Sequence, residues 1–150
     1  MFRGHFEHSI DDKGRVAVPA PFRGALVGLQ DERLVLTKFR QDGARCLDVY
    51  PLSAWRRLED KLSSRNRFDA KLLRFRNFYV AGAHECALDG QGRILIPQLL
   101  RDYAGLRRAV MFTGDVEMFR IWDHEVWQAK FSADEETVLG DDDFLSGLDI

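Results

Sequence analysis

Two stretches of the chain, 78 residues apart, carry nearly the same sequence. Residues 11–23 read DDKGRVAVPAPFR, and residues 89–101 read DGQGRILIPQLLR. When 2–23 is laid over 80–101 without a gap, seven positions are identical: Gly4/Gly82, Glu7/Glu85, Asp11/Asp89, Gly14/Gly92, Arg15/Arg93, Pro19/Pro97 and Arg23/Arg101. Two copies are too few for a solenoid, whose repeats need about three units to bury a core. The chain is therefore expected to build one core from two equivalent halves.

Each copy predicts the same order of elements. In each D-x-x-G segment, the Asp can bond nearby backbone N–H groups and the Gly can adopt a positive φ, which predicts a tight turn. The β-branched run that follows stops at a proline, which closes a strand. The expected strands are 6–10, 15–19, 33–39 and 45–50 in the first copy and 84–88, 93–97, 109–114 and 117–122 in the second. Short helices are expected to end at Gly28 and Gly105, and Ser53 and Asp123 are expected to cap the helices that follow.

Between the copies, apolar residues recur at helical spacing and predict a helical bridge with one apolar face. They are Leu58, Leu62, Phe68, Leu72 and Phe75. The expected fold is α+β, mainly β with short helices, in which the two copies face each other about a pseudo-twofold axis and close a barrel-like core. Its expected parts are a first repeat (1–55), the helical bridge (56–79), a second repeat (80–131) and an acidic C-terminal tail (132–150).

The net charge of −2 hides an uneven distribution. Residues 134–150 contain seven acids and no Lys or Arg, which leaves 22 bases against 24 − 7 = 17 acids in the body of the chain. Charges act over about 8–10 Å at physiological salt, so a body of +5 can bind a polyanion despite the acidic total. No apolar run reaches the roughly 18–20 residues of a membrane span, and the first residues lack the apolar core of a secretory signal. A cytoplasmic protein without a membrane partner is expected.

The first turn presents Lys13, Gly14 and Arg15 at a hairpin tip. Asp11 lies four residues before Arg15 and is close enough to orient its guanidinium through a charge-assisted hydrogen bond. An oriented guanidinium can bind phosphate oxygens or the O6/N7 edge of guanine. The second tip has Gln91 in place of Lys13, so the two tips are not equivalent. Spacing alone is equally compatible with simple turn-stabilising ion pairs at Asp11–Arg15 and Asp89–Arg93.

The sequence offers no pattern typical of an enzyme or a metal site. His5, His8, His84 and Cys86 lie near one another in the aligned copies, but the two copies do not use like residues at these positions. No Ser or Cys has a base at a recognisable spacing, and no phosphate-binding glycine loop is present. We therefore expect no catalysis, no metal, no cofactor and no small-molecule substrate.

Several of these segments together resemble one known family. They are MFRG, DDKGRVAVPAPFR, LDVYPLSAW, FRNFYVAGAHECALDGQGRILIPQLLRDYAGL and FRIWDHEVW. Over residues 1 to about 131 they closely resemble the MraZ family of bacterial transcriptional regulators, which is related to AbrB-type proteins. The resemblance implies an AbrB-like swapped-hairpin β-barrel built from one chain. It also implies ring-like homo-oligomers that bind double-stranded DNA at direct repeats, in the promoter of the division and cell-wall gene cluster that includes the protein's own gene.

The resemblance also assigns residues. It implies DNA contact for the Arg of D-x-x-G-R, which is Arg15 and, in the second copy, Arg93. Lys13 and Arg3 are expected in the same patch, and Asp11, Gly14, Asp89 and Gly92 are expected to orient the two turns. Arg23 and Arg101 are expected to pair with acids or with another subunit, and the arginines of 56–76 to form a solvated helix face or oligomer contacts.

Two hypotheses about function remain open. In the first, the chain is a sequence-specific DNA-binding regulator, acting as a repressor and located at the nucleoid. In the second, it is a non-DNA assembly module or an antitoxin-like partner whose acidic tail engages another protein.

Overall fold

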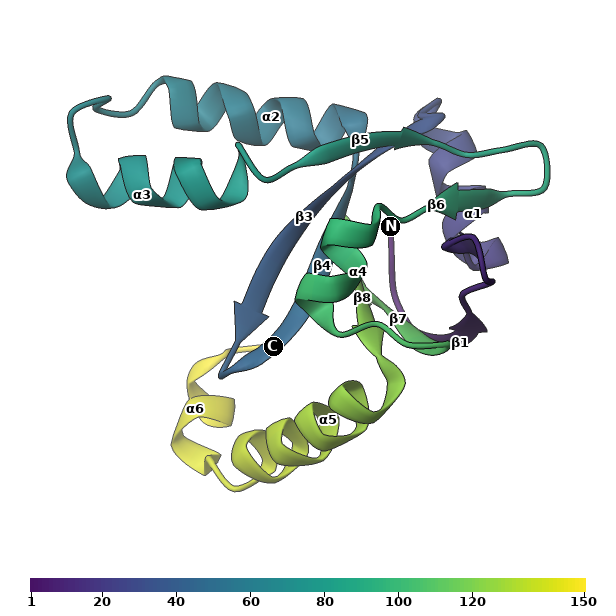
Figure 1. Ribbon diagram of the computed structural model, residues 1–150. Coiled ribbons are helices and arrows are strands. Elements are labelled where there is room, and N and C mark those ends of the chain that lie inside the picture. The colour runs from purple at the N-terminus through teal and green to yellow at the C-terminus, as the bar shows by residue number, and fades with distance from the viewer.

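The computed structural model describes residues 1–150 as a mixed α+β fold, mainly strands with several short helices (Figure 1). The first copy contains β1 (His5–Ser9), β2 (Arg15–Ala17), α1 (Ala20–Leu29), β3 (Arg33–Gln41), β4 (Ala44–Pro51) and α2 (Leu52–Ser63). Helix α3 (Ala70–Tyr79) follows, and then the second copy: β5 (His84–Ala87), β6 (Arg93–Leu95), α4 (Gln98–Ala104), β7 (Ala109–Asp115), β8 (Met118–Asp123), α5 (His124–Leu139) and α6 (Asp142–Gly147). No helix combines the length and the apolar character needed to cross a membrane.

The two copies share one antiparallel sheet with the strand order β1-β7-β8-β4-β3-β5. Strand β1 of the first copy pairs with β7 of the second, and β5 of the second pairs with β3 of the first. Equivalent strands β4 and β8 pair at the centre. Reversing this strand order replaces each strand by its counterpart in the other copy. A pseudo-twofold axis therefore passes between β4 and β8.

The sheet does not close into a barrel. Its edge strands β1 and β5 form no ladder with each other, and the three-residue strands β2 and β6 pair only with each other, as a separate two-stranded ribbon. Because this ribbon is short and hydrogen-bonded apart from the sheet, the ladder is not continuous around the core. The sheet is therefore open where a barrel was expected.

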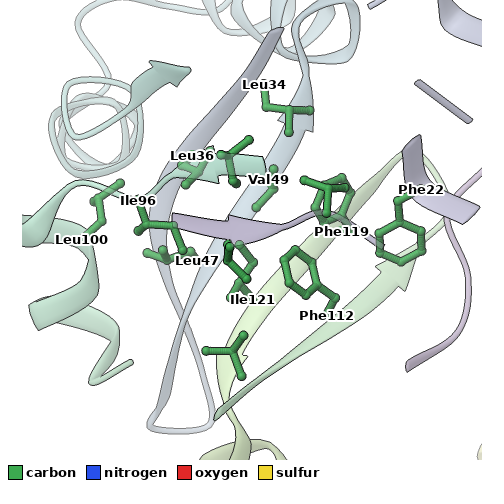
Figure 2. Close-up of a cluster of buried hydrophobic side chains, with 14 of the residues drawn as sticks. Phe22, Leu34, Leu36, Leu47, Val49, Ile96, Leu100, Phe112, Phe119 and Ile121 are labelled. Carbon is green, nitrogen blue, oxygen red and sulfur yellow. The ribbon is translucent and has the colours of Figure 1, made fainter. Parts of the chain in front are cut away.

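One apolar core lies between the sheet and the ribbon and draws on both copies. Its buried members are Phe2, Ile10, Val16, Val18, Phe22, Leu26, Leu34, Leu36, Leu47, Val49, Ile94, Ile96, Leu100, Ala104, Val110, Phe112, Phe119 and Ile121, ten of which Figure 2 labels. Val16 and Ile94 are register partners in the ribbon, and both are buried. Neither half could bury these side chains alone, since each would expose the surface that the other covers.

Helices α2 and α3 run back along one another and extend away from the ribbon (Figure 1). Their junction with the sheet is a buried polar network around Tyr79. The Tyr79 hydroxyl donates to Asp48 Oδ2 and lies 2.7 Å from the Tyr50 hydroxyl, while its carbonyl accepts from Thr37. Arg120 Nε donates to the other oxygen of Asp48 at 2.8 Å. Burial raises the pKa of Asp48 although Arg120 opposes the shift, so this carboxylate depends on its partners.

Three local predictions were wrong. Helix α2 begins at Leu52 with Pro51 at the N-cap, because Ser53 Oγ donates instead to Asp31 Oδ2 at 2.6 Å. Helix α1 runs through Gly28 and ends at Leu29. Gln30 is its C-cap, and the left-handed conformation of Gln30 lets the N–H groups of Gln30 and Asp31 satisfy the carbonyls of the last turn. The bridge is not one continuous helical face, since Phe68 lies between α2 and α3 and is exposed. Gly105 caps α4 as predicted, whereas Asp123 occupies the N-cap position of α5 without a side-chain capping bond, and its carboxylate accepts from Arg107 instead.

Candidate nucleic-acid interface

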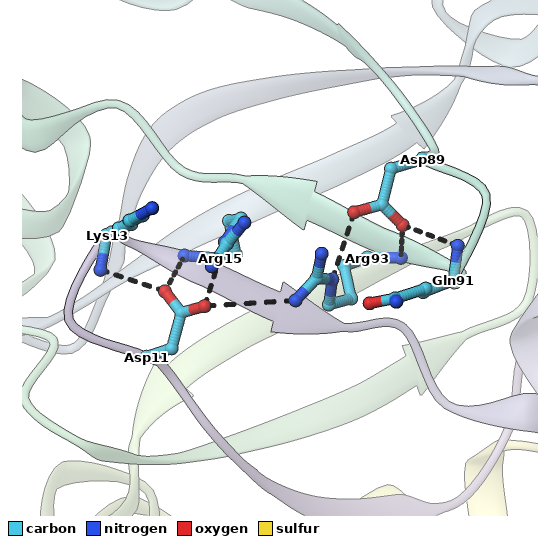
Figure 3. A network of polar contacts seen from close by, with 6 residues as sticks. All are labelled: Asp11, Lys13, Arg15, Asp89, Gln91 and Arg93. Carbon is cyan, nitrogen blue, oxygen red and sulfur yellow. Dashed lines mark hydrogen bonds and ion pairs between the residues drawn. The ribbon is translucent and has the colours of Figure 1, made fainter.

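The β2–β6 ribbon carries the two D-x-x-G-R segments. Arg15 lies opposite Leu95, Val16 opposite Ile94, and Ala17 opposite Arg93. Because successive strand residues point to opposite faces, the buried Val16 and Ile94 leave the other four side chains on the outer face. Each tight turn leads into one strand, and since the strands are antiparallel, the turns lie at opposite ends of the ribbon (Figure 3). The arginines of both copies are thus carried on one surface.

In the first tip, Asp11 uses both carboxylate oxygens. Oδ1 accepts the backbone N–H groups of Lys13 and Arg15, each at 2.9 Å, and Oδ2 accepts Arg15 Nε at 2.8 Å. These bonds lower the pKa of Asp11, and the largest cause is the backbone N–H of Arg15. Asp11 therefore fixes the turn and the guanidinium together. The two Nη atoms of Arg15 have no hydrogen-bond acceptor and remain available to a ligand.

The second tip repeats this geometry. Asp89 Oδ1 accepts from the backbone of Gln91 at 2.8 Å and of Arg93 at 2.9 Å, while Oδ2 accepts Arg93 Nε at 2.9 Å. The pKa of Asp89 is lowered, chiefly by the Arg93 backbone N–H. Arg93 Nη1 also approaches Asp11 Oδ2 across the ribbon, at 4.0 Å. Figure 3 shows this contact as the link between the two tips, so Asp11 faces both arginines.

Arg23 and Arg101 support the tips from below. Arg101 Nε donates to the Ile96 carbonyl at 2.9 Å, and Arg23 Nη1 donates to the Val18 carbonyl at 2.9 Å. A Cβ placed on Gly14 would stand 2.7 Å from Arg101 Cζ, and one on Gly92 would stand 2.6 Å from Arg23 Cδ. Each arginine therefore packs beneath the turn of the other copy. Neither forms a salt bridge with an acid, so these side chains are structural supports that sequence reasoning missed, although their identity in both copies was a signal.

Comparisons with known proteins show which family the sequence matches. The family model described as "MraZ protein, putative antitoxin-like" matches residues 1–77 and 79–142. A protein of Thioalkalivibrio sulfidiphilus named "Transcriptional regulator MraZ" is 46% identical over 127 residues, which cover 85% of this chain and 83% of the relative. A protein of the same name from Leuconostoc citreum is 37% identical over 148 residues, or 99% of this chain and 96% of the relative. The chain belongs to the MraZ family.

In this MraZ-family chain, the two other residues predicted to contact DNA, Lys13 and Arg3, lie at different distances from Arg15 along the fold. Lys13 is exposed at the first tip beside Arg15. Arg3 is also exposed, but it precedes β1, whereas the tip follows β1, and it makes no hydrogen bond or ion pair with either tip. The structure therefore brings together Lys13, Arg15 and Arg93 and leaves Arg3 at the other end of β1.

The ribbon with its supports is moderately basic. It carries five bases, namely Lys13, Arg15, Arg23, Arg93 and Arg101, against three acids, namely Asp11, Asp12 and Asp89, a balance of +2. Two of the acids are already bonded to Arg15 and Arg93. No three His, Cys, Asp or Glu side chains converge in the MraZ-family fold as metal ligands would. The chemistry that the site offers is hydrogen bonding by oriented guanidinium groups.

Proposed function

We propose that this protein is a sequence-specific DNA-binding transcriptional regulator that acts as a repressor. The observation that carries the proposal is a pair of arginines, one from each copy, fixed by Asp11 and Asp89 on the outer face of one ribbon. The name shared by the relatives, "Transcriptional regulator MraZ", supports the same conclusion. The function needs neither a catalytic residue nor a cofactor.

In this proposal the ribbon enters the major groove, which is wide enough for two antiparallel strands. Arg15 and Arg93 contact base edges or phosphates with their outward nitrogens, and Asp11 and Asp89 hold those nitrogens in place. Lys13 and Arg3 contribute phosphate contacts, which fix position without reading sequence. Gly14 and Gly92 keep the turns low over the supporting arginines. The first tip, with its additional Lys13, makes the stronger contact.

The proposal extends to assembly and operator. The two repeats, 1–55 and 80–131, form a swapped-hairpin AbrB-like head joined through the bridge at 56–79, and the heads associate into a ring-like homo-oligomer. Several heads engage direct repeats in the promoter of the division and cell-wall gene cluster, including the protein's own gene. Linked heads bind by effective concentration, so the complex is tight although each contact is weak. The protein acts in the cytoplasm at the nucleoid.

The proposal is tested by footprinting on DNA upstream of the protein's own gene at two salt concentrations. Wild type should protect repeated sites, and protection should weaken steeply as salt rises, because bound counterions are released on association. Arg15→Ala should abolish protection while the fold and the oligomer stay intact. Arg40→Ala is the matched control, since Arg40 is exposed near the far end of β3, away from the ribbon (Figure 1). Equal protection by wild type and Arg15→Ala would show that the site is wrongly assigned.

A second candidate function is an antitoxin-like interaction through the tail. Residues 134–150 contain seven acids, and they also expose Val138, Leu139, Phe144 and Leu148. Such a surface suits a basic, partly apolar protein partner. Deleting the chain after residue 133 separates the candidates in a pull-down. Loss of a partner, with no DNA affinity in the intact protein, would favour this second function.

A further inference from the structure

The outer face of the β2–β6 ribbon is not symmetric, although its backbone is. The pseudo-twofold axis relates Arg15 to Arg93 and Ala17 to Leu95. The arginines are a matched pair, with 34% and 29% of their side chains exposed. The other pair is mismatched, because Ala17 ends at its Cβ while Leu95 is a large apolar residue that is 55% exposed.

Leu95 lies directly opposite Arg15 in the ribbon. Cross-strand partners have Cβ atoms about 4.5–5.5 Å apart, and successive bases along a DNA strand are about 3.4 Å apart. A guanidinium held on a guanine edge would therefore bring Leu95 to the neighbouring base pair. In the major groove the apolar feature of a base edge is the C5-methyl group of thymine.

We propose that Leu95 reads thymine, by packing against the C5-methyl group of a thymine next to the base that Arg15 contacts. This inference rests on the proposed function and deepens it. Ala17, the counterpart beside Arg93, ends at its Cβ and reaches less far from the ribbon, so this contact is made on the Leu95 side. A twofold-symmetric reader favours palindromic sites. Leu95, together with the Lys13/Gln91 difference between the tips, gives the ribbon a direction and suits it to direct repeats.

The experiment uses a duplex that spans the footprinted region, with each thymine replaced in turn by deoxyuridine, which removes only the C5-methyl group. Wild type should bind one or two of these duplexes about three- to fivefold more weakly than the thymine duplex, as expected for the loss of one buried methyl group. Leu95→Ala should bind thymine and uracil duplexes equally. Because Leu95 is exposed, the Leu95→Ala variant should match wild type in thermal unfolding and, by light scattering, in oligomeric state.

Leu73→Ala is the matched control, since it makes the same change at a leucine that is 48% exposed on α3, a helix that extends away from the ribbon (Figure 1). It should keep the full uracil penalty. A wild type that is indifferent to every uracil, or a penalty that persists in Leu95→Ala, would overturn the inference and leave DNA binding intact. Failure of wild type to bind any of the upstream DNA would instead overturn the proposed function, and this inference with it.

Discussion

Arg101 packs beneath Gly14, so that the first tip rests on a side chain from the second copy. Arg23 and Gly92 repeat the relationship in the other direction. The backbone adds two more links, because the Ile96 N–H donates to the Gly14 carbonyl at 2.9 Å and the Val18 N–H donates to the Gly92 carbonyl at 3.0 Å. Each tip is therefore held by the copy to which it does not belong. This explains why the two arginine-bearing tips form one surface rather than two separate hairpins.

The first prediction concerns Gly14→Ala, which should lower the free energy of unfolding more than Gly43→Ala does. Both glycines have a positive φ, +86° for Gly14 and +83° for Gly43, so each alanine carries a similar backbone strain of about 1–2 kcal/mol. Only at Gly14 must Arg101 also move, giving up its bond to the Ile96 carbonyl at a cost of about 1 kcal/mol. Urea denaturation of both variants measures the difference. Equal losses would mean that Arg101 does not support the turn.

Features that depend on neighbouring residues could be predicted from the sequence. The D-x-x-G-R spacing places Asp11 beside Arg15 because the turn geometry is local, and the β-branched runs place the strands within a residue or two. Contacts between distant residues could not be predicted. A strand pattern identifies the buried face but not the partner strand, so the pairing of β1 with β7 was not expected. Similarly, Ser53 is a residue type that often caps helices, but its hydroxyl donates to Asp31, which is distant in the sequence.

The position of Arg101 under Gly14 is a further contact of this kind. The repeat showed that Arg23 and Arg101 matter in both copies, but it gave no information on whether they contact acids, solvent or backbone. In the fold they donate to the Val18 and Ile96 carbonyls. Only the exchange of elements between the copies brings these arginines to the opposite turns.

The second prediction concerns Tyr79→Phe, which should lower the free energy of unfolding by about 1–3 kcal/mol. The lost hydroxyl leaves the buried Asp48 carboxylate and the half-buried Tyr50 hydroxyl without the partner that they share. Tyr103→Phe is the control, because its hydroxyl donates to the Phe39 carbonyl at 3.2 Å in a less buried setting where water can replace it. The free energy of unfolding of Tyr103→Phe should fall by no more than about 0.5 kcal/mol. Thermal and urea unfolding measure both variants, and similar losses would show that the network does not anchor α3.

The third prediction concerns Asp11→Asn and follows from the proposed function. The amide oxygen of asparagine can still accept the backbone N–H groups of the turn, but the charged partner of Arg15 is lost. Removing a negative charge should strengthen binding to non-specific DNA, while the freed guanidinium should bind the operator less well. The ratio of operator to non-specific affinity should therefore fall, by about tenfold for the loss of one oriented contact.

Asp12→Asn separates orientation from charge in this experiment. It removes the same charge from the same tip. Unlike Asp11, however, Asp12 makes no hydrogen bond with Arg15. Asp12→Asn should strengthen binding to both kinds of DNA alike and leave the ratio unchanged. Titrations of operator and scrambled duplexes at the same salt concentration measure the ratio for each variant. A ratio that falls equally in both variants would refute the role of Asp11 in aiming Arg15.

The last prediction concerns pH and the two turn carboxylates. The pKa values of Asp11 and Asp89 are lowered in the folded protein, first of all by the backbone N–H groups of Arg15 and Arg93. The unfolded chain, with aspartate pKa values of about 3.9, therefore takes up protons before the folded chain does as the pH falls. The stability that these carboxylates contribute is complete above about pH 5 and is lost as the pH falls through their folded pKa values. The double variant Asp11→Asn, Asp89→Asn should accordingly be less stable than wild type near neutral pH. In urea titrations, the difference in free energy of unfolding between the two proteins should narrow below about pH 5. A gap that is constant or widens on acidification would show that the bonds to Arg15 and Arg93 do not stabilise the charged carboxylates, because that result requires folded pKa values that are unchanged or raised.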